Sequence, residues 1–120
     1  MFDHVTMRAS DPEASRRFYD LVFEVLEHPE PPHANEEFVE WGEFSLLPAG
    51  SGRPTRRLHV GFVAPSREHV DRFWARLTEA GYRDDGAPGP RPQYRDDYYG
   101  GFVLDPDGNN VELVHHDRAA

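Results

Sequence analysis

An internal repeat constrains the fold of this sequence more than any other feature. Residues 4–9 match residues 59–64 at an offset of 55 residues, so that His4 meets His59. The match continues beyond each of these segments, in the pairs Glu13 and Glu68, Arg17 and Arg72, and Phe18 and Phe73. A repeated unit fixes an architecture more firmly than any local propensity. The repeat therefore predicts two copies of one strand–helix unit.

In each copy, an alternating strand pattern is followed at once by a helix pattern. Ser10 or Asp11 can cap the first helix, and Pro12 suits its first turn. Ser66 can cap the second helix, which we expect to end near Gly81. Apolar residues at helical spacing predict the buried faces, which are Ala14, Phe18, Val22, Val25 and Leu26 in the first helix and Val70, Phe73, Trp74 and Leu77 in the second.

Each helix is followed by a predicted hairpin, the first over residues 37–47 and the second over residues 98–115. Residues 106–108, Pro-Asp-Gly, are a strong turn signal in the second hairpin. Aligning the hairpins pairs Ser45 with Glu112, at a longer offset of 67 residues. The added residues fall in a Pro-, Gly- and Arg-rich segment, 84–96, which we predict to be a loop with residues 86–92 at the rim of a cavity.

These patterns predict an α+β fold of two tandem βαβββ modules. The modules form a curved mixed sheet around a cavity, with the helices on its outer face. A chain of 120 residues suits one domain. We expect that domain to span residues 1–120, with module one at 1–49, a Gly- and Pro-containing linker at 50–56 and module two at 57–117.

Three side chains on separate predicted strands lie on the face away from the helices. Val5 and Met7 face the core in the first strand, so His4 points to the opposite side. The same alternation places His59 and Glu112 on that side of their strands. Two imidazoles and one carboxylate can bind Fe, Mn, Ni, Co or Zn as a divalent ion and leave positions open for a substrate. We therefore predict one divalent metal ion at these residues; the alternative is a metal-free cavity in which they are ordinary polar groups.

Three further side chains are candidates for substrate contact or catalysis. Tyr98 and Tyr99 are adjacent and point to opposite faces, which leaves only one of them for the cavity. Arg8 shares the face of His4 and can meet an anionic substrate. The other histidines are expected to be structural or solvated, although His116 shares the alternation of Glu112; they are His28, His33, His69, His115 and His116.

The composition excludes several classes of protein. Thirteen basic residues, all of them Arg, stand against 22 acidic ones, which gives a formal charge of −9. Nucleic acids and anionic membranes reward clustered basic residues, so neither is an expected partner. The absence of cysteine excludes thiolate ligands and a Cys nucleophile. The sequence has no pattern of a signal peptide and no apolar run of membrane-spanning length, so we expect a cytoplasmic location.

Four segments, 4–6, 11–19, 58–62 and 99–112, together resemble the vicinal oxygen chelate superfamily. That superfamily includes glyoxalase I, extradiol dioxygenases, fosfomycin-modifying transferases and bleomycin resistance proteins. The resemblance covers almost the whole chain, and it implies that the metal ligands are His4, His59 and Glu112. Glyoxalase I takes a fourth ligand from the closing strand of its first module, where this sequence has Ser45. The resemblance therefore favours a three-ligand site.

The resemblance implies a metal-dependent enzyme whose small substrate chelates the metal through neighbouring oxygens, in a lyase, isomerase or dioxygenase reaction. The alternative is a metal-independent protein that sequesters an antibiotic or another hydrophobic cation. The charge of −9 and aromatic residues such as Trp41, Phe44 and Tyr98 suit that alternative. We expect a homodimer, with the modules paired within one chain or exchanged between two. In an exchanged dimer, His4 and His59 of one site come from different chains.

Overall fold

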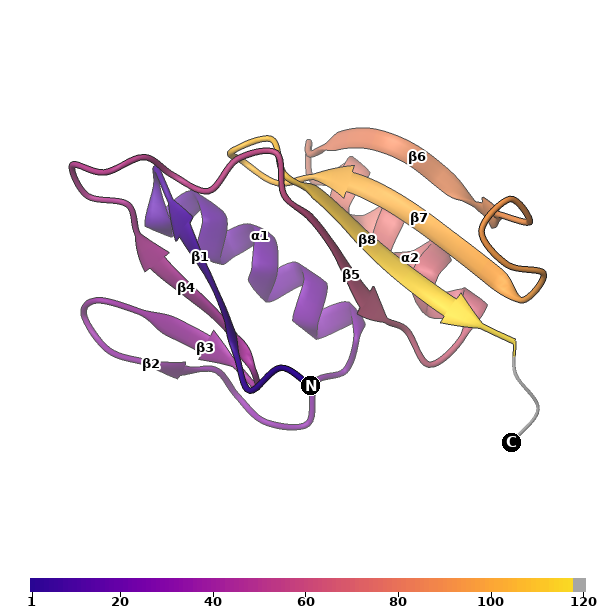
Figure 1. The fold of residues 1–120 in the computed structure, drawn as a ribbon, viewed down its shortest axis with the longest axis horizontal. Helices are drawn as coiled ribbons and strands as arrows, with labels where there is room; N and C mark the ends of the chain where they lie inside the picture. The colour runs from indigo at the N-terminus through magenta and orange to yellow at the C-terminus, as the bar shows by residue number, and fades with distance from the viewer. Residues whose placement is uncertain (118–120) are drawn as a thin grey trace.

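Along residues 1–117, which the computed structural model describes, one order of elements occurs twice (Figure 1). Module one contains β1 (Val5–Ala9), α1 (Pro12–Val25), β2 (His33–Ala34), β3 (Val39–Trp41) and β4 (Phe44–Pro48). Module two contains β5 (His59–Val63), α2 (Arg67–Glu79), β6 (Arg83–Pro90), β7 (Tyr98–Leu104) and β8 (Asn110–His116). The predicted α+β fold of two βαβββ modules is confirmed, and residues 118–120 of the predicted domain lie outside the described residues.

The strands form two four-stranded sheets, of order β1-β4-β3-β2 and β5-β8-β7-β6. In each module the first strand pairs in parallel with the last, and the remaining pairs are antiparallel. Thr6 is paired with Ser45, and Gly61 is paired with Glu112. The two offsets found in the sequence therefore correspond to one pairing register that is repeated in both modules.

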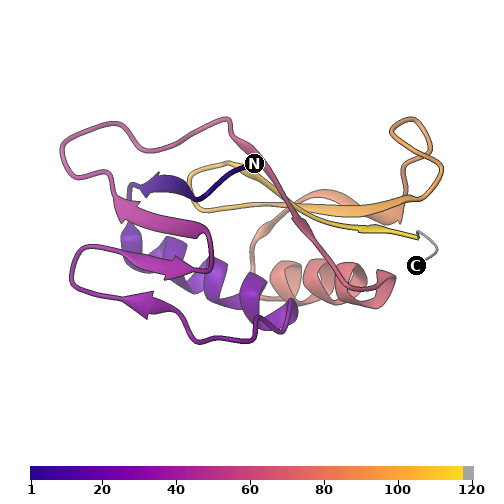
Figure 2. The same ribbon diagram turned by 60° about the horizontal axis from the view of Figure 1, so that its bottom comes forward.

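Both helices lie on the same side of the sheets, as Figure 2 shows. The carboxylate of Asp11 caps α1 by accepting a hydrogen bond from the Ala14 N–H at 3.2 Å. The hydroxyl of Ser66 caps α2 by accepting one from the His69 N–H, also at 3.2 Å. Both caps are among those predicted from the sequence. Among the described residues, no helix covers the opposite face of either sheet, and His59 and Glu112 lie on that face of the second sheet.

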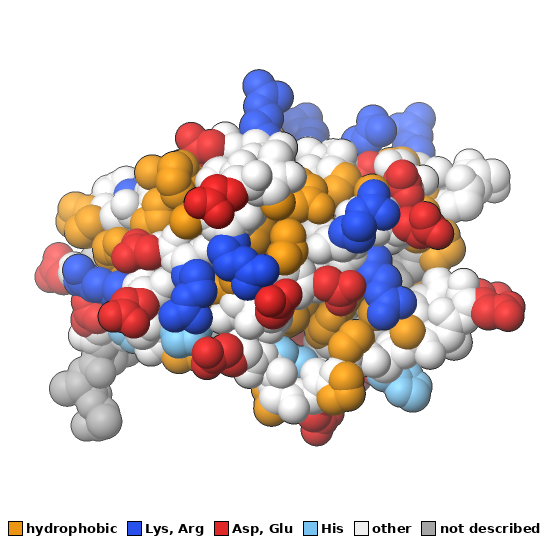
Figure 3. All heavy atoms as spheres, turned by 180° about the vertical axis from the view of Figure 1, so that it is seen from behind, with side chains coloured by type: hydrophobic (Ala, Val, Ile, Leu, Met, Phe, Trp, Pro, Cys, Tyr) orange, Lys and Arg blue, Asp and Glu red, His pale blue; other side chains and the backbone are white. Residues whose placement is uncertain are grey.

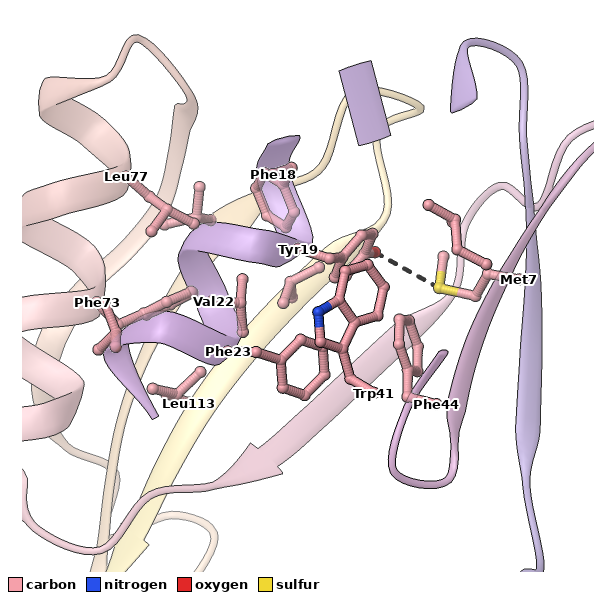
Figure 4. Packing of buried hydrophobic residues seen from close by; sticks show 14 of the residues in the cluster. Met7, Phe18, Tyr19, Val22, Phe23, Trp41, Phe44, Phe73, Leu77 and Leu113 are labelled. Atoms are coloured by element: carbon pink, nitrogen blue, oxygen red, sulfur yellow. Dashed lines mark hydrogen bonds between the residues drawn. The ribbon is translucent and has the colours of Figure 1, made fainter. Parts of the chain in front are cut away.

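Aromatic side chains from both modules fill the core between helices and sheets (Figure 4). Phe23 of α1 stacks on Trp41 of β3 with ring centroids 5.0 Å apart. Phe62 of β5 meets Phe23 edge-on at 5.2 Å and Phe44 at 5.3 Å. Each large apolar side chain that is fully buried stabilises the fold by about 1.5–3 kcal/mol. Because Phe62 belongs to module two and its partners to module one, this cluster joins the modules.

The turn between β7 and β8 joins the modules a second time. The buried carboxylate of Asp105 accepts a hydrogen bond from the Tyr19 hydroxyl of α1 at 2.7 Å. The buried side chain of Asn109 donates to the Thr55 carbonyl at 2.9 Å and accepts from the Leu58 N–H at 3.0 Å. We refer to these five residues as the clasp. It holds the start of β5 beside the start of β8.

The prediction of a loop over residues 84–96 is wrong for its first half, which forms β6. A Gly- and Pro-rich segment can form a strand here because β6 is the edge of its sheet, where a proline without an N–H interrupts no ladder. The pairing of β6 with β7 shifts register on either side of Gly86, as in a β-bulge. The short strand β2 also lacks a strand pattern in the sequence, and it exists through its pairing with β3.

The two sheets lie side by side in a molecule with extents of 43 × 27 × 25 Å. Among the described strands, β1 pairs only with β4 and β5 only with β8, so each has one edge that pairs with no described strand. Thr55 of the linker covers part of that edge of β1, where its N–H donates to the Arg8 carbonyl at 2.8 Å. Figure 3 shows acidic and basic side chains interspersed over the face opposite to the view of Figure 1. Neither α1 nor α2 is long and apolar enough to span a membrane.

Candidate functional site

A cluster of polar side chains lies on the face of the second sheet that α2 leaves open. Along β8, Val111 and Leu113 are buried in the core, so Glu112 between them points to the open face. Along β5, Val60 packs against the core and His59 is exposed. The alternation of each strand therefore directs His59 and Glu112 to the same face.

Glu112 is held in a tight cradle, with only 2% of the residue exposed. The Tyr98 hydroxyl donates a hydrogen bond to its Oε2. A Cβ atom at Gly100 would lie 2.7 Å from Oε2, whereas one at Gly61 would lie 3.5 Å from Oε1. The carboxylate therefore needs a glycine on β7. Burial, together with the hydrogen bond to Glu112, raises the pKa of the Tyr98 hydroxyl, which keeps Tyr98 a donor.

A chain of hydrogen bonds fixes the imidazole of His59. The side chain of Asn110 places its oxygen against His59 Nδ1 and donates its Nδ2 to the carboxylate of Asp85. An ionised carboxylate only accepts, so Asp85 determines which way the amide of Asn110 points. The amide oxygen then accepts from a protonated Nδ1. Partners of this kind commonly fix the ring of a metal-binding histidine and leave its other nitrogen free to bind.

The other nitrogen of His59, Nε2, is within hydrogen-bond distance of Oε1 of Glu112, at 3.0 Å. Because Nδ1 donates to Asn110 and Oε2 accepts from Tyr98, the two facing atoms both present lone pairs. A cation between them, either a proton on His59 or a metal ion, removes their repulsion. Two ligand atoms that each lie about 2.1 Å from one ion, at a right angle, are about 3 Å apart. The pair therefore fits two ligands of one divalent metal ion.

His4, the third predicted ligand, lies apart from this pair. It precedes β1, its side chain is 64% exposed, and its Nδ1 lies 2.7 Å from the carboxylate of Asp3. Within residues 1–117, no group of three or more His, Cys, Asp or Glu side chains lies close enough to hold one metal ion. A single chain thus brings together His59 and Glu112 and leaves His4 outside.

Of the two tyrosine candidates, Tyr98 faces the site and Tyr99 faces the other way. Tyr99 donates a hydrogen bond to Asp71 of α2, and its ring lies 4.7 Å from the guanidinium carbon of Arg67. Hydrogen bonding to Asp71 also raises the pKa of Tyr99. Arg8 lies on the exposed side of β1 and does not line the pocket beside His59. Tyr98 is therefore the candidate that can act with Glu112.

The counterpart of Glu112 in module one, Ser45, is buried and donates a hydrogen bond to Glu40 at 3.0 Å. This hydroxyl is occupied within its own sheet. His116, the histidine that shares the alternation of Glu112, lies edge-on to the Tyr98 ring at 5.3 Å. It therefore supports the tyrosine rather than adding to the pair.

Two hollows border the pair and the module junction. A polar pocket of about 440 Å³ lies beside His59 and is also lined by Asp85, Gly86, Arg91, Tyr94, Phe102 and Asn110. An apolar groove of about 630 Å³ lies between module one and β5, with a lining that includes Phe2, Phe23, Trp41, Phe44 and Phe62. His59 is thus the member of the pair that lines the polar pocket, whereas Glu112 is not among its lining residues.

Sequence reasoning misses three residues of this site, Asp85, Gly100 and Asn110. Asn110 carries a signal, because it shares the alternation of Glu112 two residues further on. Gly100 carries another, because a glycine inside a strand pattern often marks a close approach. Asp85 carries none, since its position depends on a strand that the sequence predicts as a loop.

The structure therefore combines two βαβββ modules with a histidine–carboxylate pair on the open face of the second sheet. Residues 1–113 match the family model of the Glyoxalase/Bleomycin resistance protein/Dioxygenase superfamily. The chain belongs to that superfamily, as its sequence predicts. No protein of curated function matches the sequence significantly.

Solved structures agree with this assignment. A glyoxalase/bleomycin resistance protein from Albidiferax ferrireducens is 31% identical with a TM-score of 0.82, over 97% of this chain and 99% of that one. A lactoylglutathione lyase from Agrobacterium tumefaciens is 19% identical with a TM-score of 0.69, over 96% and 92% of the two chains. Oxidase ChaP-H2 is 22% identical with a TM-score of 0.65, over 100% and 96%. The last two show a shared fold.

Proposed function

We propose that this protein is a divalent-metal-dependent enzyme acting on a small substrate that chelates the metal through neighbouring oxygens. The observation that carries the proposal is the pair of His59 Nε2 and Glu112 Oε1, 3.0 Å apart, with the other polar atom of each side chain committed to a neighbour. Imidazole and carboxylate suit Fe, Mn, Ni, Co or Zn as the divalent ion. The cytoplasmic location expected from the sequence stays a prediction.

In this proposal the chain's own residues preorganise the ligands. Asp85 and Asn110 hold the imidazole of His59, and Tyr98 with Gly100 holds the carboxylate of Glu112. A bound divalent ion would supply Lewis acidity toward negative charge that develops on a substrate oxygen. Lyase, isomerase and dioxygenase reactions share that need. The fold is found in both a lactoylglutathione lyase and an oxidase, so it accommodates more than one of these reactions.

For the third ligand we propose His4 of a second copy, in a homodimer with exchanged modules. Three observations support this arrangement. His4 is exposed, it is separated from the pair within one chain, and β1, like β5, has an edge that pairs with no described strand. A two-fold dimer that brings these edges together would form two equivalent sites.

Metal titration tests the proposal directly. We expect the wild-type protein to bind one Mn(II), Co(II), Ni(II) or Zn(II) per chain in calorimetry. His59→Ala and Glu112→Ala should each lower the affinity at least about tenfold, since each removes a ligand. His33→Ala, which removes an exposed histidine of β2, is the matched control and should bind as the wild type does. Equal metal affinities in all four proteins would mean that His59 and Glu112 form an ion pair with each other and do not bind the metal.

The apolar groove favours a second candidate function, the binding of a hydrophobic cation without metal. Trp41 and Phe44, two of the aromatic residues suited to such binding, line this groove, whereas Tyr98 lies at the histidine–carboxylate pair. The formal charge of −9 would attract a cation. The metal titration separates the two functions, because binding in the groove requires neither His59 nor Glu112.

A further inference from the structure

The polar pocket beside His59 contains one cation, Arg91, at the start of the loop between β6 and β7. The guanidinium carbon lies 5.4 Å from the centre of the Phe102 ring. The ring of His59 lies 6.0 Å from the centre of that same ring. Arg91 and His59 therefore line the same hollow, and each lies near the ring of Phe102.

The backbone of β6 holds the guanidinium of Arg91 in this position. Its Nη2 donates to the Ala87 carbonyl at 2.7 Å, and its Nη1 approaches the Pro90 carbonyl at 3.3 Å. A Cβ atom at Gly89 would lie 3.2 Å from Nη1, so the glycine leaves room for the group. A guanidinium has five N–H donors, and these two bonds leave about three of them for a ligand.

Arg91 has no acidic partner within residues 1–117. The arginines that form ion pairs there are Arg16, Arg67, Arg72 and Arg76. The one carboxylate that lines the pocket, Asp85, accepts a hydrogen bond from Asn110. In a chain with a formal charge of −9, a fixed arginine without a carboxylate partner in a pocket is ready to bind an anion.

We propose that Arg91 binds a carboxylate or a similar oxyanion on the substrate. The inference rests on the proposed function and narrows its substrate to a molecule with two parts. One part presents neighbouring oxygens to the metal at His59 and Glu112, and the other presents an anionic group to Arg91. Phe102 and the exposed ring of Tyr94 line the space between and contact the body of the molecule. The pocket of about 440 Å³ is of the size that holds a small molecule.

A pair of probe ligands isolates the anionic group. Catechol and 3,4-dihydroxybenzoate present the same neighbouring oxygens, but only the second carries a carboxylate. We expect the Zn(II)-loaded wild type to bind the benzoate at least about tenfold more tightly in calorimetry, because bidentate charged hydrogen bonds are strong. Arg91→Gln should abolish this preference and leave the affinity for catechol unchanged. Arg91→Lys keeps the charge but loses the planar fork, so it should retain a part of the preference.

Arg83→Gln is the control, because Arg83 is an exposed arginine at the other end of β6. It should keep the wild-type preference. Equal binding of catechol and the benzoate by the wild type, or loss of preference in Arg83→Gln as well, would overturn the role of Arg91 and leave the metal site standing. If the wild type binds neither Zn(II) nor catechol, the proposed function fails and the inference fails with it.

Discussion

At the scale of single residues, the candidate site depends on glycines as much as on its ligands. Glu112 is fully surrounded, and the space for its carboxylate exists because β7 has no side chain at Gly100. Gly61, paired with Glu112 across β5 and β8, has more room. This difference allows the geometry of the carboxylate to be tested without removing it.

Gly100→Ala and Gly61→Ala form a matched pair of variants. At position 100 a Cβ atom would lie 2.7 Å from Oε2 of Glu112 and 3.1 Å from the ring of Tyr98, so the carboxylate has to move. At position 61 the closest atom would be 3.5 Å away, an ordinary contact. We expect Gly100→Ala to lower metal affinity about tenfold or more, because a metal ligand that is no longer held in position by its neighbours binds less tightly. Gly61→Ala should lower the affinity far less. Equal metal affinities in the two variants would contradict the cradle.

At the scale of secondary-structure elements, the clasp couples the hairpin turn of module two to α1 of module one. Tyr19 is the residue of the clasp that belongs to α1, and it is fully buried. The Tyr19 hydroxyl contacts both Asp105 and the sulfur of Met7, the second of which Figure 4 shows. Burial, and after it the charge of the Asp105 carboxylate, raise the pKa of this hydroxyl above its ordinary value of 10.0. The native state therefore favours the neutral phenol.

The clasp predicts a loss of stability in alkaline solution. A group whose pKa is raised in the folded state stabilises the protein fully below its unfolded pKa, here about 10, and loses that contribution as the pH rises further. Urea unfolding between pH 8 and 11 should show a falling free energy of unfolding above about pH 10. Tyr19→Phe should be less stable than the wild type at pH 8, by about 1–3 kcal/mol, because Asp105 loses a donor. Its stability should fall less steeply above pH 10; an unchanged slope would contradict the role of Tyr19.

The elements show which parts of the fold local sequence can predict. Both helices and the strands that contain His59 and Glu112 follow from alternation, helical spacing and caps, which are properties of neighbouring residues. The strand β6 does not, because proline and glycine are tolerated there only through its place at a sheet edge. The residues 105–109 predict a turn, but their buried contacts with Tyr19 and Thr55 depend on where module one lies. Local sequence patterns therefore do not predict the contacts between residues that are far apart in the chain.

The same distinction holds for the candidate site. Alternation alone brings His59 and Glu112 to one face, because both strands belong to one sheet. The neighbours that orient them, Asp85, Asn110 and Gly100, depend on the pairing of β5 through β8. His4 shares the repeat with His59 but precedes β1, which is a strand of the other sheet, so sequence periodicity says nothing about its distance from the pair.

At the scale of the whole molecule, the side-by-side arrangement of the sheets separates His4 from the pair of His59 and Glu112 within one chain. The repeat matches His4 with His59, and the structure places His4 just before β1 of the first sheet and His59 at the start of β5 in the second. A second copy related by two-fold symmetry can return His4 to a site that contains His59 and Glu112. We therefore propose that the metal site is built from two chains.

The metal stoichiometry of a mixed dimer shows whether each site takes ligands from two chains. His4→Ala and Glu112→Ala chains carrying different affinity tags are co-expressed, and the mixed dimer is purified through both tags. Each variant alone should lose tight metal binding. In the mixed dimer, one site contains both substitutions and the other contains neither, so we expect about one ion per dimer, half the wild-type value. If the ligands of each site came from one chain, both sites would stay damaged, and a mixed dimer without tight metal binding would contradict a site shared between two chains.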